Sequence, residues 1–161
     1  MFRHSLKLFS RRVSKLTLFI TATALIVIAS GQSSAQRSEP EPTFSDFKGV
    51  RIGTTADEAR KKLGSPRDKG DDQDFYVFND TQAVQIFYDK TAKVSAISID
   101  YMTGASGIPA PKDVLGTEAD KKPDGSVYKL VRYPKAGYWV SYSRTAGDSP
   151  TTTVTMQKIE H

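Results

Sequence analysis

The sequence contains no cysteine and only two histidines. Without cysteine the chain has no disulfide, no thiol nucleophile, no cysteine-linked lipid and no cysteine-based zinc or iron–sulfur site. His4 lies within the leader described below and His161 stands last in the chain. The part between them therefore has no imidazole for general-base catalysis or metal binding, and its function must rest on other side chains.

Long hydrophobic runs are also scarce. The main apolar run, 16–29, is too short to cross a membrane as a helix, which takes about 20 apolar residues. Basic residues and no acidic residue precede it, and the small residues 33–35 follow it. This pattern predicts a secretory signal peptide over 1–35, cleaved after Ala35. The protein is then exported to a periplasm or secreted, and Arg11-Arg12 leaves the twin-arginine route open beside the general one.

A net charge is missing from the mature chain as well. The whole sequence has 23 basic and 18 acidic residues, and five of the basic residues lie in the leader, which leaves 18 of each sign. The mature part has no basic stripe with interleaved aromatic residues, the pattern typical of nucleic-acid-binding proteins. We therefore expect no nucleic-acid partner and, without cysteine, no lipid anchor after cleavage.

The mature chain begins with a polar segment, 36–43, which contains two prolines and is predicted to be a flexible tether. A single folded domain is predicted over 44–160.

A short helix with clear boundary signals opens the domain. Thr55 and Glu58 have the spacing of a capping box, and acidic residues of the first turn give way to basic residues in the last. Gly64 is the predicted left-handed C-cap. Because so short a helix is unstable alone, its small apolar residues Ala56 and Ala59 are expected to pack closely on a sheet.

Strands account for most of the remaining domain. Six segments rich in aromatic and β-branched residues are separated by turns, and apolar residues alternate with polar ones. The segments are 74–80, 83–89, 94–101, 126–133, 137–143 and 152–159. The predicted class is α+β, with short helices packed on one face of an antiparallel sheet.

The order of these elements recurs along the chain. Val114-Leu115-Gly116 marks a second, shorter helix, three strands follow it, and Tyr128 takes the place of Tyr76 in the first half. This recurrence predicts two tandem helix-plus-three-strand units, about 48–101 and 110–160. The alternative is a six-stranded sheet without an internal repeat, whose turns are similarly spaced.

These features resemble the SmpA/OmlA family, also called BamE-like, and more widely the beta-lactamase-inhibitor-protein-like fold. The resemblance rests on Ile52-Gly53-Thr54, the acid-rich short helix, Leu63-Gly64 with Pro66, and a strand that ends at Tyr88-Asp89. It is closer over 48–101 than over 110–160. It implies a non-catalytic envelope protein, because relatives assist outer-membrane protein assembly or bind an enzyme across the exposed sheet face. The chain lacks the lipidated cysteine of the assembly factors.

Strand alternation also predicts a candidate binding surface. If Tyr138, Val140 and Tyr142 pack beneath the helices, Trp139 faces the other side of the sheet. An exposed aromatic side chain is typical of interface anchors. We therefore expect a non-enzymatic interaction module that binds an unidentified envelope protein. The candidate partner-binding residues are Trp139, Phe87, Gln85 and Arg132, with Arg144 as a further rim residue. The alternatives are a reversed face assignment, or a tether and loops that cover this side of the sheet. The oligomeric state stays open.

Other sites are weaker. Asp71, Asp72 and Asp74 are candidate calcium ligands, but their spacing is not that of an EF-hand, so 68–74 is predicted to be a solvated loop, and no metal or cofactor is expected. Two other functions stay open. One is a small-ligand-binding protein with a cleft between the two repeats and the 102–111 linker. The other is an enzyme that uses scattered carboxylates, among them Asp113 and Asp124, although no catalytic motif supports it.

Overall fold

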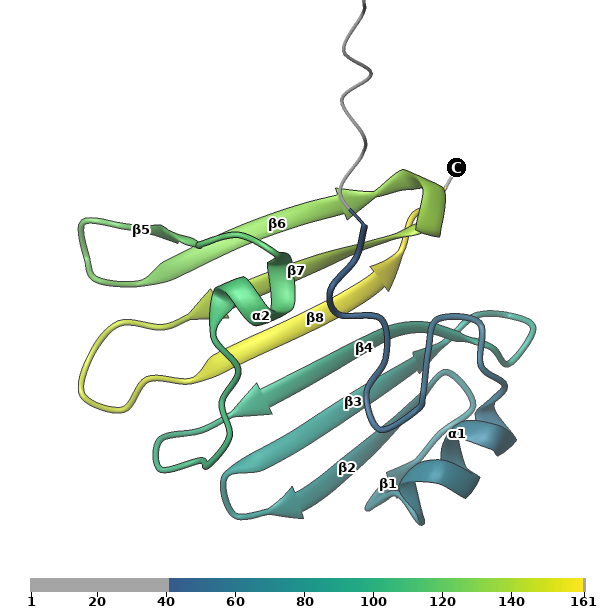
Figure 1. Ribbon diagram of the computed structural model, residues 1–161. Coiled ribbons are helices and arrows are strands. Elements are labelled where there is room, and N and C mark those ends of the chain that lie inside the picture. Colours follow the sequence, from purple (N-terminus) through teal and green to yellow (C-terminus); the bar gives the residue numbers. More distant parts are fainter. Residues whose placement is uncertain (1–40, 161) are drawn as a thin grey trace, which may run out of the picture. The chain divides into compact units, whose positions relative to one another are not determined.

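A computed structural model describes residues 41–160, which form an eight-stranded antiparallel sheet with two short helices and one 3₁₀ turn (Figure 1). The α+β class is thus confirmed. The signal-peptide prediction and most of the tether prediction concern residues outside this range. No helix within 41–160 has the length and apolar character needed to span a membrane. The strands are β1 (Asp68–Lys69), β2 (Gln73–Asn79), β3 (Gln82–Tyr88), β4 (Val94–Tyr101), β5 (Asp120–Lys121), β6 (Val127–Tyr133), β7 (Tyr138–Arg144) and β8 (Thr152–Lys158).

The strands follow the order β1-β2-β3-β4-β8-β7-β6-β5, and every neighbouring pair is antiparallel. The β2–β4 and β6–β8 meanders are joined at the centre by β4 and β8, where Ile97 stands opposite Met156. The six predicted strands are confirmed to within one residue at each end. The edge strands β1 and β5 were not predicted, because two residues are too few to show a period.

The first helix, α1 (Ala56–Leu63), begins with the predicted capping box. The Glu58 N–H donates to Thr55 Oγ1, and the Thr55 N–H donates to Glu58 Oε2, both at 3.3 Å. Ala56 and Ala59 are buried as expected. The predicted left-handed cap at Gly64 is wrong in detail, because its φ of 88° comes with a ψ of −163°. That region of backbone space is almost exclusive to glycine.

The second helix, α2 (Pro111–Leu115), packs on β7 and holds the start of the described chain. Thr43 Oγ1 donates to the Val114 carbonyl at 2.8 Å, and the Tyr138 hydroxyl donates to the Phe44 carbonyl at 3.3 Å. Thr43, which the sequence analysis assigns to the tether, is therefore hydrogen-bonded to α2. The 3₁₀ turn η1 (Pro134–Ala136) links β6 to β7.

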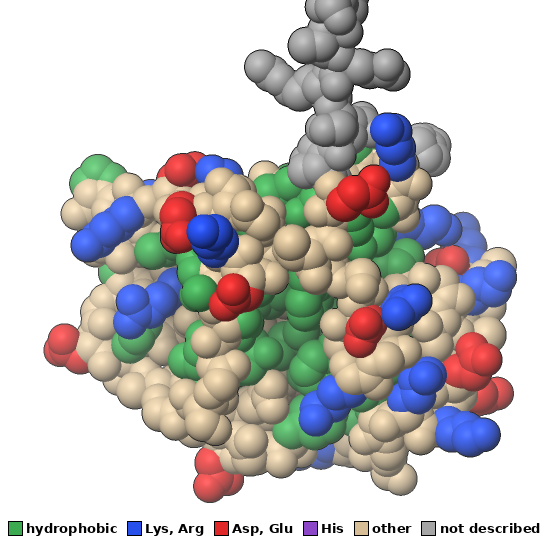
Figure 2. Space-filling view, in the orientation of Figure 1, with side chains coloured by type: hydrophobic (Ala, Val, Ile, Leu, Met, Phe, Trp, Pro, Cys, Tyr) green, Lys and Arg blue, Asp and Glu red, His purple; other side chains and the backbone are tan. Residues whose placement is uncertain are grey.

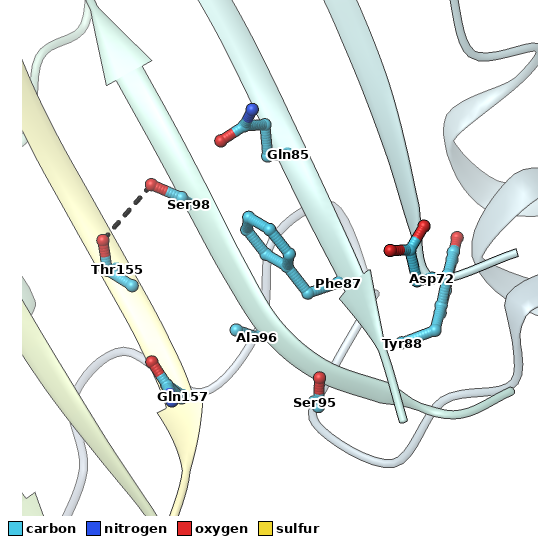
Figure 3. Close-up of a pocket in the computed structure, with 9 residues that line it drawn as sticks. All are labelled: Asp72, Gln85, Phe87, Tyr88, Ser95, Ala96, Ser98, Thr155 and Gln157. Carbon is cyan, nitrogen blue, oxygen red and sulfur yellow. Dashed lines mark hydrogen bonds between the residues drawn. The ribbon is translucent and has the colours of Figure 1, made fainter. Parts of the chain in front are cut away.

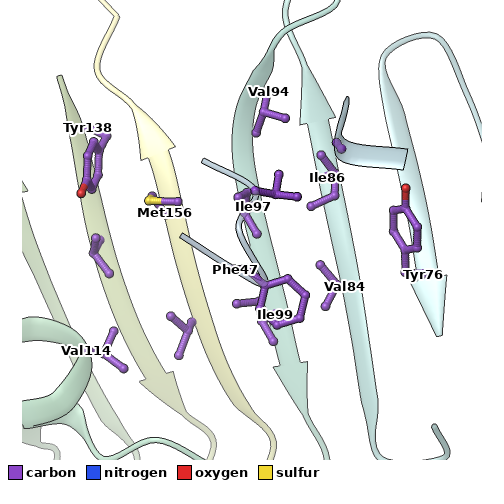
Figure 4. Close-up of a cluster of buried hydrophobic side chains, with 14 of the residues drawn as sticks. Phe47, Tyr76, Val84, Ile86, Val94, Ile97, Ile99, Val114, Tyr138 and Met156 are labelled. Atoms are coloured by element: carbon purple, nitrogen blue, oxygen red, sulfur yellow. The ribbon is translucent and has the colours of Figure 1, made fainter. Parts of the chain in front are cut away.

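One core lies between a single face of the sheet and the segments that cover it (Figure 4). Both helices contribute buried residues to it, and so do Phe47 and Val50 of the segment before α1. The helices thus cover one face, as predicted. Figure 2 shows this side, where hydrophobic side chains remain visible between the covering segments. The buried sheet residues include Val84, Ile86, Ile97, Ile99, Val140, Val154 and Met156.

The register of β6 corrects one detail of the predicted repeat. Val131 stands opposite Val140 of β7, and both lie on the core side. Tyr128 is therefore on the other side, where its side chain is 44% exposed, whereas Tyr76 of β2 is buried. The predicted equivalence of Tyr128 with Tyr76 is wrong. On β2 the even-numbered residue Tyr76 faces the core, whereas on β6 the odd-numbered residue Val131 does.

Candidate functional site on the open face of the sheet

The face of the sheet turned away from both helices, called here the open face, carries a row of side chains that crosses all six long strands. Strand register places one residue from each of the six long strands directly opposite the next. This set, called here the aromatic row, runs through Gln73, Phe87, Ala96, Gln157, Trp139 and Arg132. Its two aromatic residues are separated by three strand spacings, or about 14 Å.

All four predicted partner-binding residues lie on the open face. Phe87, Trp139 and Arg132 belong to the aromatic row, and Gln85 lies in the next row, opposite Ser98. The two aromatic side chains are half-buried and Arg132 is exposed. Arg144 has the parity of Tyr142, so its predicted place at the rim of this face is wrong.

A groove of about 460 Å³ crosses the open face where β4 meets β8 (Figure 3). Figure 3 shows the Phe87 ring among the polar side chains of the groove. The hydroxyls of Ser98 and Thr155 are hydrogen-bonded across the β4–β8 junction at 3.3 Å. The amides of Gln85 and Gln157 have no hydrogen bond to any residue within 41–160, so both can serve a ligand. The lining residues are Asp72, Gln85, Phe87, Tyr88, Ser95, Ala96, Ser98, Thr155 and Gln157.

The predicted linker is not part of this groove. No lining residue of the groove comes from 102–111. The linker is instead hydrogen-bonded to the β2–β3 turn and to the loop before β8. The Met102 N–H donates to the Thr81 carbonyl at 2.8 Å, and Thr103 Oγ1 donates to the Pro150 carbonyl at 3.1 Å.

Charge on the open face is confined to a few positions. On the six long strands, Asp100 and Arg132 are the charged residues with open-face parity. The Asp100 carboxylate accepts a hydrogen bond from Thr153 Oγ1 at 2.6 Å. Arg132 has no ion-pair partner among the described residues. Exposed Asp72, which precedes β2 in the chain, also lines the groove.

The acidic segment 68–74 contains both exposed and buried carboxylates. Asp71 and Asp72 are exposed, but Asp74 is fully buried on the core side. At one end of the segment Asp68 and Lys69 form β1, and at the other end Asp74 is buried. The predicted solvated loop is therefore wrong for both ends. Within 41–160, no three histidine or acidic residues are grouped so that they could hold a metal ion.

Asp74 is instead the acceptor of a buried hydrogen-bond cluster. Oδ2 accepts from Arg60 Nε at 2.8 Å and from the Tyr88 hydroxyl at 2.7 Å, and Oδ1 accepts from Arg60 Nη2 at 3.1 Å and from the Gly70 N–H at 3.3 Å. Burial alone would raise the pKa of Asp74, but these bonds outweigh it and hold the pKa below its usual value. Both carboxylate oxygens are therefore occupied by structural contacts.

Two tyrosines surround this carboxylate. Burial and the hydrogen bond to Asp74 raise the pKa of Tyr88, and burial with the nearby Asp74 charge raises the pKa of Tyr76 to about 12. The buried Tyr76 hydroxyl has no hydrogen-bond partner in the described structure. Sequence reasoning missed the cluster, although Asp74 has the same strand parity as buried Tyr76.

The scattered carboxylates considered for an enzyme do not meet in the groove. Asp113, Glu118, Asp120 and Asp124 are all exposed, and none lines it. Asp120 instead lies 3.5 Å from the ammonium group of Lys129 on β6.

Comparison with known proteins identifies no family for this chain. No family model matches the sequence, and no curated protein matches it. The structure is similar to that of a DUF4309 family protein (YjgB) from Bacillus subtilis, with a TM-score of 0.48 and 18% sequence identity, over 75% of this chain and 88% of that chain.

Proposed function

We propose that this chain is an exported, non-enzymatic cell-envelope protein that binds a protein partner across the open face of its sheet. The observation that carries the proposal is the position of Phe87 and Trp139. Both are only half-buried, and they lie in one row on a face that neither helix covers. Half-buried aromatic side chains on a surface with few charged groups are typical of protein interfaces.

The dimensions of the open face support a protein partner. Six long strands span about 24 Å across the sheet, and a strand of seven residues is about 23 Å long. The product, roughly 550 Å², approaches the ~800 Å² that each partner buries in a standard interface. Surrounding loops would supply the remainder.

The order of elements supports the further proposal of two related units. α1 precedes β1 to β4, and α2 precedes β5 to β8. Each unit is then a helix, a two-residue edge strand and three long strands, and the two units join through β4 and β8. This arrangement is what a BamE-like or inhibitor-like tandem protein would need in order to present one continuous binding face.

The proposed export and lack of catalysis rest on separate grounds. The 1–35 leader supports delivery to a periplasm or secretion. Among the described residues, the one buried acid is Asp74, and Arg60, Tyr88 and Gly70 occupy its oxygens. A carboxylate held in this way is not available as a nucleophile or general base.

Site-specific photo-cross-linking in the native envelope tests the proposal. A photoreactive residue at Gln157, on the open face, should give a protein adduct of one defined mass. The control places the same group at Lys61, an exposed position on α1. Adducts that form equally from both positions, or no protein adduct from Gln157, would count against binding through the open face.

A small polar ligand is the second candidate, and the groove at the β4–β8 junction favours it. A volume of about 460 Å³ and the free amides of Gln85 and Gln157 suit such a molecule. However, the lining residues come from the sheet strands and from Asp72 just before β2, so the groove would cover a ligand mainly from one side. Native mass spectrometry of the protein purified from its own cells distinguishes the two, because a small ligand would add a fixed low mass.

A further inference from the structure

The groups next to the two ends of the aromatic row carry opposite charges: Arg132 is the last residue of the row on β6, and Asp72 precedes Gln73, the residue at the other end. Arg132 at the β6 end is exposed and has no ion-pair partner within 41–160. Asp72, which precedes Gln73 in the chain and lines the same groove as Phe87, is exposed and has no cation paired with its carboxylate in the described part. Between them, the row consists of uncharged side chains.

We propose that the aromatic row receives one extended segment of the protein partner, which lies across the strands with an acidic residue at Arg132 and a basic residue at Asp72. This inference rests on the proposed function and names the part of the partner that the open face recognises. Its basis is charge complementarity along a row of fixed register.

The length of the segment follows from the spacing of the strands. The row crosses five strand intervals, or about 24 Å. An extended chain advances about 3.4 Å per residue, so about seven residues cover the row from end to end. Trp139 and Phe87 are about 14 Å apart, which corresponds to about four residues. Side chains at positions i and i+4 of an extended segment point to the same side, so two apolar residues can meet the two rings together.

The polar side chains between the rings suit the backbone of such a segment. Gln157 lies in the row between Phe87 and Trp139, and Gln85 borders it. A side-chain amide offers both donors and an acceptor, which match the peptide N–H and C=O groups that lose water on binding. These free amides would fix the segment without requiring a particular side chain above Ala96.

A second copy of the chain fits this surface less well. The centre of the open face is formed by Gln85, Ser98, Thr155, Gln157 and Ala96, whereas stable homodimers bury a more apolar centre. The area of roughly 550 Å² suits a standard interface but is well below the about 1,000–2,500 Å² that each protomer of an obligate homodimer buries.

The test uses the mature chain and a library of seven-residue loops displayed on an inert scaffold. Binders that depend on Trp139 should carry an acidic residue at one end, a basic residue at the other, and apolar residues four apart. The matched variant is Asp72→Lys combined with Arg132→Glu, which changes two exposed side chains and should leave the thermal transition unchanged. A binder with its end charges exchanged should prefer this variant over the wild type by at least about tenfold.

Several results would overturn the inference. The library could yield no binder that Trp139→Ala weakens, or the end charges of the binders could have no influence on affinity. Trp139 could instead be needed to bind a neutral oligosaccharide such as chitohexaose. Sedimentation could also show a dimer that depends on Trp139. The proposed function is judged separately. If Gln157 gives a protein adduct but the charge swap has no effect on binding, the proposed function is supported and the proposed extended segment is contradicted.

Discussion

Arg60 of α1 donates from Nε to Oδ2 of Asp74 on β2 at 2.8 Å, and the Asp74 side chain has no exposed surface. The Tyr88 hydroxyl on β3 donates to the same oxygen at 2.7 Å. One buried carboxylate therefore links the helix to two strands. Removal of one partner leaves the other without compensation, which typically lowers stability by 3–5 kcal/mol. Because the Arg60 side chain is 21% exposed, the lower end of that range applies.

Arg60→Ala should therefore lower the free energy of unfolding by about 3 kcal/mol at pH 7, as measured by urea denaturation.

Asp74→Asn tests the same link through the pH dependence of stability. The pKa of Asp74 is lower in the folded state than the unfolded value of about 3.9, so its stabilisation is present above about pH 4. The stability difference between wild type and Asp74→Asn should shrink as the pH falls through the folded pKa. Asp72→Asn, at an exposed carboxylate, is the control, and a difference that stays constant with pH would contradict the account.

Loss of the α1 cap should have a smaller effect. Thr55→Ala removes the oxygen that accepts from the Glu58 N–H, and the expected destabilisation is about 1 kcal/mol. Thr55→Ser keeps the hydroxyl and should remain close to wild type in the same urea experiment. If both variants were equally destabilised, the methyl group of Thr55 rather than its hydroxyl would be the stabilising element.

Local patterns in the sequence were sufficient to predict much of the fold. The capping box at Thr55 and the six long strands depend on neighbouring residues, and the structure confirms them. Alternation along β7 also gave the correct side for Trp139, because residues two apart share a face of a strand.

Features that depend on distant or very short segments could not be predicted. The pairing of β4 with β8 joins residues such as Ile97 and Met156, which are far apart in sequence, and no local pattern shows which strands are neighbours. The Asp74 cluster was missed because a polar, acid-rich segment is typical of a loop. Its ion pair with Arg60 depends on how α1 lies against β2.

The turn after β3 gives a prediction that NMR can check at one carboxyl group. Asp89 Oδ1 accepts from Thr91 Oγ1 at 2.6 Å, from the Thr91 N–H at 2.8 Å and from the Lys93 N–H at 3.2 Å. The Thr91 hydroxyl is the leading cause that lowers the pKa of Asp89 to about 2. Thr91→Val should raise this pKa toward the ordinary value near 3.9, and Thr91→Ser should not. A carboxyl ¹³C titration that shows the same pKa in all three proteins would rule out the hydroxyl as the cause.

Trp139 and Met156 provide the sharpest comparison between the two faces of the sheet. Met156 on β8 has no exposed surface and packs in the core, so Met156→Ala should lower the free energy of unfolding by about 3 kcal/mol. Trp139 is half-buried on the open face, so Trp139→Ala should lower it by about 1 kcal/mol. The cross-linking yield from Gln157 should respond in the opposite order: Trp139→Ala should reduce it strongly, and Met156→Ala should leave it near wild type at a temperature where that variant is folded. Equal losses of stability would instead make Trp139 a structural residue, and Trp139 would then no longer support the proposed binding surface.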